Sequence, residues 1–346
     1  MANADFGSPT GKLLRAEEYN PKHAAFPRLA PHEIWRAEWE VSSFRADVLA
    51  GLARMQKSIP PKYFYDVTGA ALFEKICDLP EYYVTRAELE ILAAHAGELA
   101  EMIGPDATLV ELGSGNSLKT AYLLDRLQQP RAYVPVDVCA EALADAVQRL
   151  HRRYPGLLVL PVRADFTSSF PLPPAAAKAT RTAVFFPGST IGNLESSEAV
   201  MLLRKIHRRL ANGGVLIVGV DVTKPKAVLE RAYNDSAGLT AAFNRNLLVR
   251  IRDELDAVID PDAFDHHAWY NAELGRIEMH LRSREDQLVH IDGQSFRFRP
   301  GETLHTENAY KYAPAEFTAL AERSGLKSHA VWRDQAGLFS VHLLKP

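Results

Sequence analysis

The chain has 346 residues, of which 47% are hydrophobic and 24% charged, and its 40 basic and 43 acidic residues give a formal net charge of −3. This composition is typical of globular proteins and argues against extensive disorder. Because the charges nearly balance, the protein has no net positive electrostatic potential that would attract nucleic acid or an anionic membrane. We therefore expect a small-molecule partner. The longest apolar run, 213–222, is far shorter than the ~18 residues that a membrane span requires.

The chain contains two cysteines, Cys77 and Cys139. They are too few for a disulfide framework, and their spacing does not fit paired zinc ligands. We therefore expect two reduced packing residues, no metal site and a cytoplasmic location. The expected state is a monomer.

Apolar strands and amphipathic helices alternate from about residue 87 onward. The predicted strands span 108–112, 132–136, 157–162, 183–187 and 215–221, and the predicted helices span 117–128, 140–154 and 196–211. Most of these strands are continuous apolar runs, which indicates burial on both faces of a parallel sheet. The pattern predicts an α/β fold with a doubly wound, mostly parallel, Rossmann-like sheet.

The pattern changes after residue 221. A helical stretch over 224–255 is followed by strands within 277–298, a helix at 314–324, and a hairpin of strands at 328–332 and 338–344. The hairpin would add two strands, one of them antiparallel, to the edge of the main sheet. We predict a smaller α+β substrate domain from residues 58–86 and 222–310, a main domain from 87–221 and 311–346, and an N-terminal extension of residues 1–57.

A glycine-rich turn, ELGSGN at 111–116, directly follows the first predicted strand. Glycines at Gly113 and Gly115 would let the backbone approach a bound adenosyl group closely. Asp137 ends the second strand, where a carboxylate can accept both ribose hydroxyls. The third glycine of a dinucleotide fingerprint is replaced by Leu118, which favours a cofactor without a pyrophosphate, such as S-adenosyl-L-methionine.

Two further positions fit a nucleoside ligand. Asp165 and Phe166 follow the third strand, where an acid can bind the adenine amine and an aromatic ring can cover its face. Lys119 lies one turn into the next helix, as either a solvated helix charge or a group beside the methionyl carboxylate. A tight turn without a ligand remains the alternative for the glycine motif alone.

Several longer segments carry a resemblance. They are SIPPKYFYD at 58–66, LPEYYVTR at 79–86, GSTIGN at 188–193, AYND at 232–235 and TAAFNRN at 240–246. In this order they closely resemble the histidine Nα-methyltransferases of ergothioneine biosynthesis, from about residue 58 to the C-terminus. The resemblance implies the class I methyltransferase fold, S-adenosyl-L-methionine as cofactor, and three successive methyl transfers to the α-amine of L-histidine.

The resemblance also implies site residues. At the cofactor it places Gly113, Lys119, Asp137, Asp165 and Phe166. At the amino acid it places Tyr65, Tyr82, Gly188, Asn193, Tyr233, Met279 and Glu307. Asn193 and Tyr233 would hold the carboxylate, Glu307 and Tyr82 would meet the imidazole, and Tyr65 is the candidate to accept or relay the amine proton.

The chemistry requires little else. Methyl transfer is an in-line displacement, so holding nitrogen and methyl at ~3 to 3.5 Å supplies much of the catalysis without a metal or a covalent nucleophile. An amide and a phenol offer donors to the carboxylate without a cation that would repel the sulfonium.

Each substrate-site residue also has a structural alternative. The aromatic side chains could be core residues, Met279 could be ordinary strand packing, and Glu307 could be a surface acid. Ala309 stands where the family commonly has serine, which removes a hydroxyl that could bond the ring. Two other functions stay open: an Nα-methyltransferase of another aromatic amino acid, and a non-catalytic protein of the same fold that binds a nucleoside or amino acid.

Overall fold

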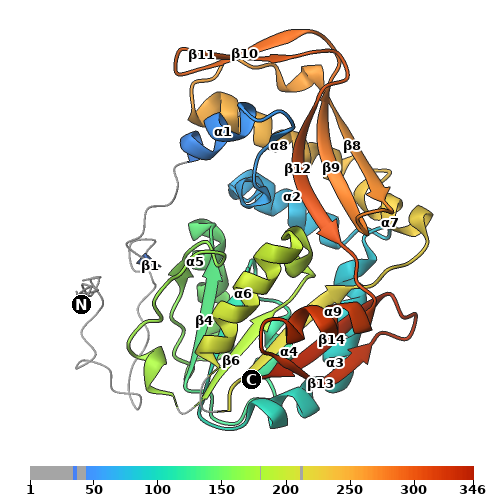
Figure 1. The fold of residues 1–346 in the computed structure, drawn as a ribbon. Helices are drawn as coiled ribbons and strands as arrows, with labels where there is room; N and C mark the ends of the chain where they lie inside the picture. Colours follow the sequence, from blue (N-terminus) through green and yellow to red (C-terminus); the bar gives the residue numbers. More distant parts are fainter. Residues whose placement is uncertain (1–33, 37–43, 180, 211–212) are drawn as a thin grey trace, which may run out of the picture.

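The computed structural model describes residues 34–36, 44–179, 181–210 and 213–346, which form two parts around two sheets (Figure 1). The predicted extension of residues 1–57 falls largely outside the described residues. Within the described ranges, no helix has the length and apolarity to cross a membrane.

Within the described residues, the larger sheet has eight strands. In spatial order they are β1 (Trp35–Arg36), β5 (Val162–Arg163), β4 (Ala132–Asp137), β3 (Ala107–Leu112), β6 (Arg181–Phe186), β7 (Val215–Asp221), β14 (Phe339–Lys345) and β13 (Lys327–Arg333). Neighbouring strands from β1 to β7 pair in parallel, and β14 pairs antiparallel to both β7 and β13. The predicted α/β fold and the terminal hairpin at the sheet edge are therefore confirmed.

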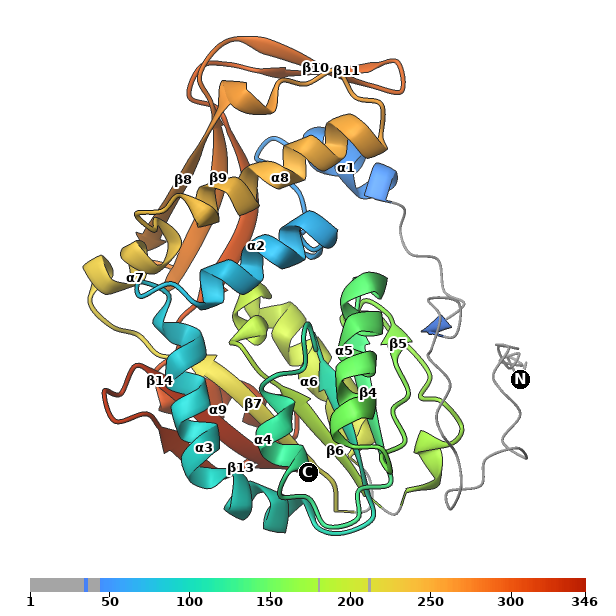
Figure 2. The same cartoon turned by 180° about the vertical axis from the view of Figure 1, so that it is seen from behind.

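Helices cover both faces of this sheet (Figures 1 and 2). One face carries α3 (Tyr83–Ile103), α4 (Thr120–Leu124) and α5 (Ala140–Arg153), and the other carries α6 (Ser196–Arg209) and α9 (Pro314–Glu322). Side chains of each strand alternate between two hydrophobic cores, as Leu109 and Val110 of β3 do. Burial on both faces explains why these strands are continuous apolar runs.

One predicted strand is much shorter than expected. Residues 157–162 form a single bridge, Tyr133 with Val159, before β5 begins at Val162. Pro161 interrupts the segment, because proline has no backbone N–H to donate to a sheet ladder. The strand is therefore split where the sequence pattern alone suggested a continuous run.

The second part is built on a four-stranded mixed sheet. Its strands, in spatial order, are β2 (Lys57–Ser58), β12 (Thr303–Tyr310), β9 (Arg276–Ser283) and β8 (Phe264–Asn271). The other elements are α1 (Phe44–Leu52), η3 (Pro61–Phe64), α2 (Val67–Cys77), α7 (Lys226–Tyr233), α8 (Leu239–Glu254) and the hairpin of β10 (Gln287–Ile291) and β11 (Gln294–Phe298). The smaller α+β unit predicted beside the main sheet is present.

The helical stretch predicted over 224–255 is two helices. Asp235 separates them, because its carboxylate accepts hydrogen bonds from the backbone N–H groups of Leu239 and Thr240, at 2.9 and 2.8 Å. A carboxylate at this position satisfies free donors at the start of α8. The break turns the chain, so that α7 and α8 both pack against β8 and β9.

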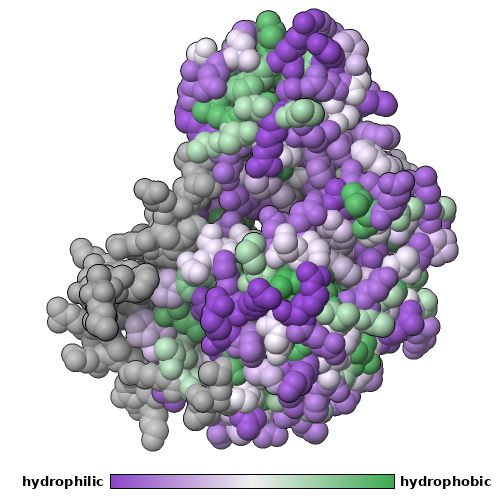
Figure 3. Space-filling model, viewed as in Figure 1, coloured by the Kyte–Doolittle hydropathy of each residue, from purple (hydrophilic) through white to green (hydrophobic). Residues whose placement is uncertain are grey.

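The second part lies over the edge of the large sheet at which β3, β4 and β6 end (Figure 1). In open parallel sheets, ligands bind at this edge, where the strand order changes direction. Here that point is β3, because β4 follows on one side of it and β6 on the other. Hydrophilic residues are spread over both parts on the face seen in Figure 3.

Candidate active site

One cavity of about 1250 Å³ lies between the two parts of the protein. Its lining includes every residue that the sequence singled out for cofactor or substrate, from Tyr65 to Glu307. The large sheet contributes the loops after β3, β4 and β6, and the smaller part contributes η3, α2, α7 and the strands β9 and β12. The structure therefore brings the predicted residues together, although they are far apart in the sequence.

The glycine turn after β3 forms the floor at one end of this cavity. Gly113 and Gly115 have φ angles of +68° and +48°, a backbone region that favours glycine. The N–H groups of Gly113 and Ser114 both donate to the carbonyl of Val136 on β4. The turn is thereby held open toward the cavity, where the Ser114 hydroxyl is buried without a partner among the described residues.

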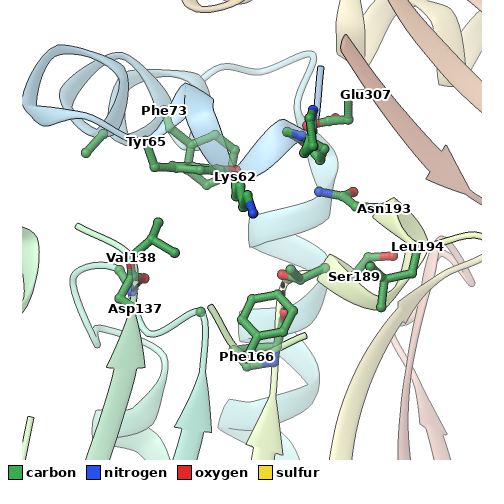
Figure 4. Close-up of a pocket in the computed structure, with 18 of the residues that line it drawn as sticks. Lys62, Tyr65, Phe73, Asp137, Val138, Phe166, Ser189, Asn193, Leu194 and Glu307 are labelled. Carbon is green, nitrogen blue, oxygen red and sulfur yellow. Dashed lines mark hydrogen bonds between the residues drawn. The ribbon is translucent and has the colours of Figure 1, made fainter. Parts of the chain in front are cut away.

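Asp137 is the anchor of the neighbouring loop. Its carboxylate accepts hydrogen bonds from the N–H groups of Gly115, at 2.9 Å, and Cys139, at 3.0 Å. Burial raises the pKa of Asp137, and these backbone donors oppose that rise. The carboxylate faces the cavity from the end of β4 (Figure 4), and its remaining lone pairs suit the two hydroxyls of a ribose.

Asp165 and Phe166 follow β5, and a Cβ on Gly113 of the glycine turn would lie 3.6 Å from the Phe166 ring. One carboxylate oxygen of Asp165 accepts from the backbone N–H and the hydroxyl of Thr167, at 2.8 and 2.5 Å. The other oxygen lies 3.2 Å from the ammonium of Lys62, which reaches across the cavity from η3. An adenine ring between Phe166 and the glycine turn would present its amine to Asp165, so the residues fit a nucleoside cofactor.

Lys119 takes part in a buried ion pair that the sequence did not predict. Its ammonium lies 2.6 Å from Glu88 of α3, and Glu88 also accepts the backbone N–H of Gly188 at 2.9 Å. Burial lowers the pKa of Lys119, but the nearby Glu88 carboxylate more than offsets this and raises it overall. Lys119 therefore remains a cation at the cavity wall.

Glu88 could have been found from its position in the helix. It falls in the buried stripe of α3 with Val84, Ile91 and Leu92, where a carboxylate needs partners. Gly219 of β7 leaves the space for it, because a Cβ there would lie 2.0 Å from the Glu88 carboxylate.

Aromatic rings enclose the other end of the cavity. Tyr65 packs edge-on against Phe73 and Phe243, with centroids 5.6 and 5.5 Å apart, and Tyr82 packs against Phe73 and Tyr233 at 6.1 and 6.4 Å. Burial, with a smaller contribution from other groups, raises the pKa of both Tyr65 and Tyr82 well above the usual value. Both phenols therefore stay protonated.

Asn193 ends the 3₁₀ turn η5 (Thr190–Asn193) that follows β6, and its side chain projects into the cavity below Glu307 (Figure 4). Gly188 and Ser189 adopt positive φ angles at the start of this segment. The turn packs closely against β12, because a Cβ on Gly192 would lie 2.8 Å from the carbonyl of Tyr310. Gly188 and Asn193 therefore reach the cavity from one short segment.

Tyr233 ends α7, and its hydroxyl accepts a hydrogen bond from the ammonium of Lys311 at 3.0 Å. Its backbone carbonyl meets His266, whose other ring nitrogen meets Asn244 at 2.9 Å. Burial raises the pKa of Tyr233 to about 12. Lys311 was not predicted, since a single lysine between two tyrosines gives no signal of burial.

Glu307 and Met279 face the cavity from β12 and β9. Glu307 is 9% exposed, and burial raises its pKa to about 7, while the Lys311 ammonium acts in the opposite direction. With a pKa near neutral, Glu307 can be ionised, and the ionised carboxylate accepts a hydrogen bond from a ring N–H. Ala309 lies two residues further on the same strand face and is buried.

Glu278, His280 and His305 form a cluster on the outer face of the smaller sheet, with possible ligand atoms within 4.8 Å. The two imidazoles are stacked at 4.5 Å with an angle of 10° between their planes, so their lone pairs point in parallel and do not converge. Arg276 also occupies the Glu278 carboxylate at 2.8 Å. This geometry does not suit a metal ion.

Comparisons with known proteins agree with this geometry. A family model described as "Histidine-specific methyltransferase, SAM-dependent" matches residues 44–346. Histidine N-alpha-methyltransferase of Mycolicibacterium smegmatis is 41% identical, covering 89% of this chain and 96% of that protein. The Mycobacterium tuberculosis protein of the same name is also 41% identical, covering 87% of this chain and 94% of its own length. Ergothioneine biosynthesis protein 1 of Schizosaccharomyces pombe is 25% identical, covering 83% of this chain and 38% of that protein.

The mostly parallel sheet and the cavity at its carboxyl edge define an α/β class I methyltransferase that depends on S-adenosyl-L-methionine. Within that class, the chain belongs to the histidine-specific, S-adenosylmethionine-dependent methyltransferases. The family, fold and cofactor predicted from the sequence are confirmed.

Proposed function

We propose that the protein methylates the α-amine of L-histidine three times, giving Nα,Nα,Nα-trimethylhistidine, the first step of ergothioneine biosynthesis. Family membership and the relatives named histidine N-alpha-methyltransferase support this substrate. The observation that carries it is Glu307, a buried carboxylate at the aromatic end of the cavity. There it would accept the imidazole N–H, in a bond worth roughly 1.5 to 3 kcal/mol.

S-Adenosyl-L-methionine supplies an electrophilic methyl group on a sulfonium. Asp137 would hold its ribose hydroxyls, Asp165 its adenine amine, Phe166 the face of the adenine, and Gly113 the close backbone approach. Lys119 would lie beside the methionyl carboxylate, where the Glu88 pair keeps it charged and fixed. These residues would orient the methyl toward the smaller part of the protein.

The amino acid would lie between η5 and the aromatic end. Asn193 and Tyr233 would donate to its carboxylate, Gly188 would lie near its amine, and Tyr82 and Met279 would pack around the imidazole that Glu307 holds. With both partners fixed, the amine nitrogen and the methyl would meet at about 3 to 3.5 Å, the separation at which positioning contributes most.

Tyr65 would handle the proton that each transfer releases. Because its phenol stays protonated, it is not a resident base, but its oxygen can accept an amine N–H while its own O–H donates to water. The proton lost by nitrogen would thus leave through the hydroxyl to solvent. The faces of Tyr65 and Phe243 would also attract the growing quaternary ammonium.

Mass analysis of free histidine incubated with the protein and S-adenosyl-L-methionine tests this function. We expect mono-, di- and trimethylated histidine, all modified at the α-nitrogen, at catalytic protein concentration. Tryptophan and tyrosine serve as controls and should react much more slowly. Methylation of tryptophan or tyrosine in preference to histidine would assign a different aromatic substrate. If none of the three amino acids is methylated, the protein would be a binding protein without catalytic activity.

We also propose that the protein works as a monomer in the cytoplasm. The free thiols of Cys77 and Cys139 are in keeping with the reducing cytoplasm. Light scattering should give a mass near the 38.4 kDa of one chain. A mass twice as large would contradict the monomer.

A further inference from the structure

Lys311 is a buried cation directly behind the proposed carboxylate-binding end of the cavity. Its side chain is 1% exposed, and its ammonium lies 2.8 Å from Asp221 and 3.0 Å from the hydroxyl of Tyr233. It follows β12, at the point where the chain returns from the smaller part to the large sheet. Lys311 does not line the cavity, so it would act on a ligand through the residues that do.

Asp221 at the end of β7 holds Lys311 in place. Its side chain is fully buried and accepts hydrogen bonds from Lys311, Lys224 and the hydroxyl of Tyr83. Burial alone would raise the pKa of Asp221, but the two ammonium groups lower it below the usual value. The ionised Asp221 carboxylate therefore holds the ammonium of Lys311 beneath the Tyr233 hydroxyl.

The direction of the hydrogen bond decides what Tyr233 can do. An ammonium has donors only, so the Tyr233 oxygen accepts from Lys311 and keeps its own hydrogen available. Among the described residues, no acceptor takes that hydrogen. Tyr233 is therefore poised as a donor toward the cavity, as a substrate carboxylate requires.

We propose that Lys311 is a positioning residue for the amino-acid substrate: it fixes Tyr233 as a hydrogen-bond donor to the carboxylate and places a positive charge near both that carboxylate and Glu307. This inference rests on the proposed function. The Tyr233 phenol separates the Lys311 ammonium from the substrate. Lys311 would therefore attract the substrate carboxylate without placing a cation next to the sulfonium of the cofactor.

The charge of Lys311 also reaches Glu307. The groups that face this carboxylate are the phenols of Tyr65, Tyr82 and Tyr233 and the Lys311 ammonium, with His305 on the same strand bound to the Glu307 carbonyl. The phenols stay neutral, so Lys311 is the charged group that favours ionised Glu307. Its loss would raise the pKa of Glu307 above about 7.

Lys224 offers a matched control. It binds the same Asp221 carboxylate at 2.5 Å, and its side chain is 4% exposed, but its phenol partner is Tyr83 at 2.8 Å. Burial lowers the pKa of Lys224 to about 8. Removing either lysine disturbs Asp221, whereas only Lys311 contacts Tyr233.

The experiment compares Lys311→Met with Lys224→Met in the full chain. For Lys311→Met we expect the KM for histidine to rise about tenfold or more, the acid limb of kcat/KM to move to higher pH, and the affinity for S-adenosyl-L-methionine to stay within about twofold. For Lys224→Met the histidine KM and the acid limb should stay near those of the parent. In a Tyr233→Phe background, Lys311→Met should raise KM by much less.

Equal effects of the two lysine substitutions on KM, with an unmoved acid limb, would overturn the proposal and leave Lys311 a structural residue. If Lys311→Met does not fold, Lys311→Gln tests the same point, because it keeps a donor to Tyr233 and loses the charge: the acid limb should still move. Lys311→Arg should restore the acid limb. The parent in the same assay separates this test from the proposed function, which fails only if the parent does not methylate histidine.

Discussion

Glu307 and Met279 lie directly opposite each other on β12 and β9, and a β-bulge at Thr306 puts both side chains on the face toward the cavity. Before the bulge, His305 pairs with His280 on the outer face. In a regular ladder with Thr306 opposite Met279, Glu307 would pair with Glu278 and point outward, because neighbouring positions of a strand alternate between faces. The bulge therefore directs the proposed imidazole-binding carboxylate inward.

Thr306→Val tests the bulge. The hydroxyl of Thr306 donates to the side chain of Asn244 at 2.8 Å or to the carbonyl of Met279 at 3.0 Å, and valine has nearly the same shape without these bonds. We expect a loss of about 1 to 3 kcal/mol of stability and a higher histidine KM, with cofactor affinity unchanged. Thr303→Val on the same strand is the control, and an equal rise in KM there would refute a specific role of the bulge.

Asp137→Ala should weaken S-adenosyl-L-methionine binding by ~1 to 3 kcal/mol, because the ribose loses charge-assisted hydrogen bonds. Isothermal titration calorimetry measures this directly. Since Asp137 also accepts the N–H groups of Gly115 and Cys139, Asp137→Asn should be measured alongside, to retain the size of the side chain. Unchanged affinity in both variants would remove Asp137 from the cofactor site.

Asn193→Ala and Tyr233→Phe should each raise the KM for histidine, while the dissociation constant of the cofactor stays close to that of the parent. The reason is that both side chains are proposed to donate to the substrate carboxylate alone, at ~0.5 to 1.5 kcal/mol or more per bond. Steady-state kinetics and calorimetry on the same preparations separate the two ligands. Equal losses for both would contradict this division of roles.

Glu307→Gln should make the ligand-free protein more stable at pH 8 than the parent. Burial raises the pKa of Glu307 from its ordinary value to about 7, so ionising it in the folded state costs free energy. That cost is absent well below pH 4.5, grows as pH rises toward 7, and is then constant at about 3 kcal/mol. Thermal unfolding across this pH range should show the two proteins diverging as pH rises; parallel curves would mean that Glu307 ionises without cost.

Much of the cofactor end follows from the sequence. Gly113 and Asp137 come directly after predicted strands and Asp165 follows a third within three residues, and the carboxyl ends of parallel strands meet at one edge, so their proximity could be predicted. The shortened strand before Val162 could have been predicted from Pro161, which has no backbone N–H for a sheet ladder, although the apolar run 157–162 alone suggested a full strand.

The substrate end could not be derived in the same way. The placement of Glu307 depends on a one-residue bulge, and no composition or periodicity around Thr306 announces it. That residue was proposed from the family resemblance and not from its spacing. Lys62 acquires its partner Asp165 only when the two parts of the protein come together, and Lys311 meets Asp221 only when the chain returns from β12 to the end of β7.

Glu307 is proposed to be the residue that makes the pocket selective for histidine. The direct measurement is the ratio of kcat/KM for histidine to that for tryptophan, in the parent, in Glu307→Ala and in Ala309→Ser. An indole cannot repeat the geometry of the imidazole and would leave the buried carboxylate unpaired, which discriminates more strongly than pocket size. We expect Glu307→Ala to reduce the ratio by about tenfold or more, and Ala309→Ser to keep or increase it. A ratio unchanged in Glu307→Ala would contradict the claim, because the carboxylate would then not read the imidazole.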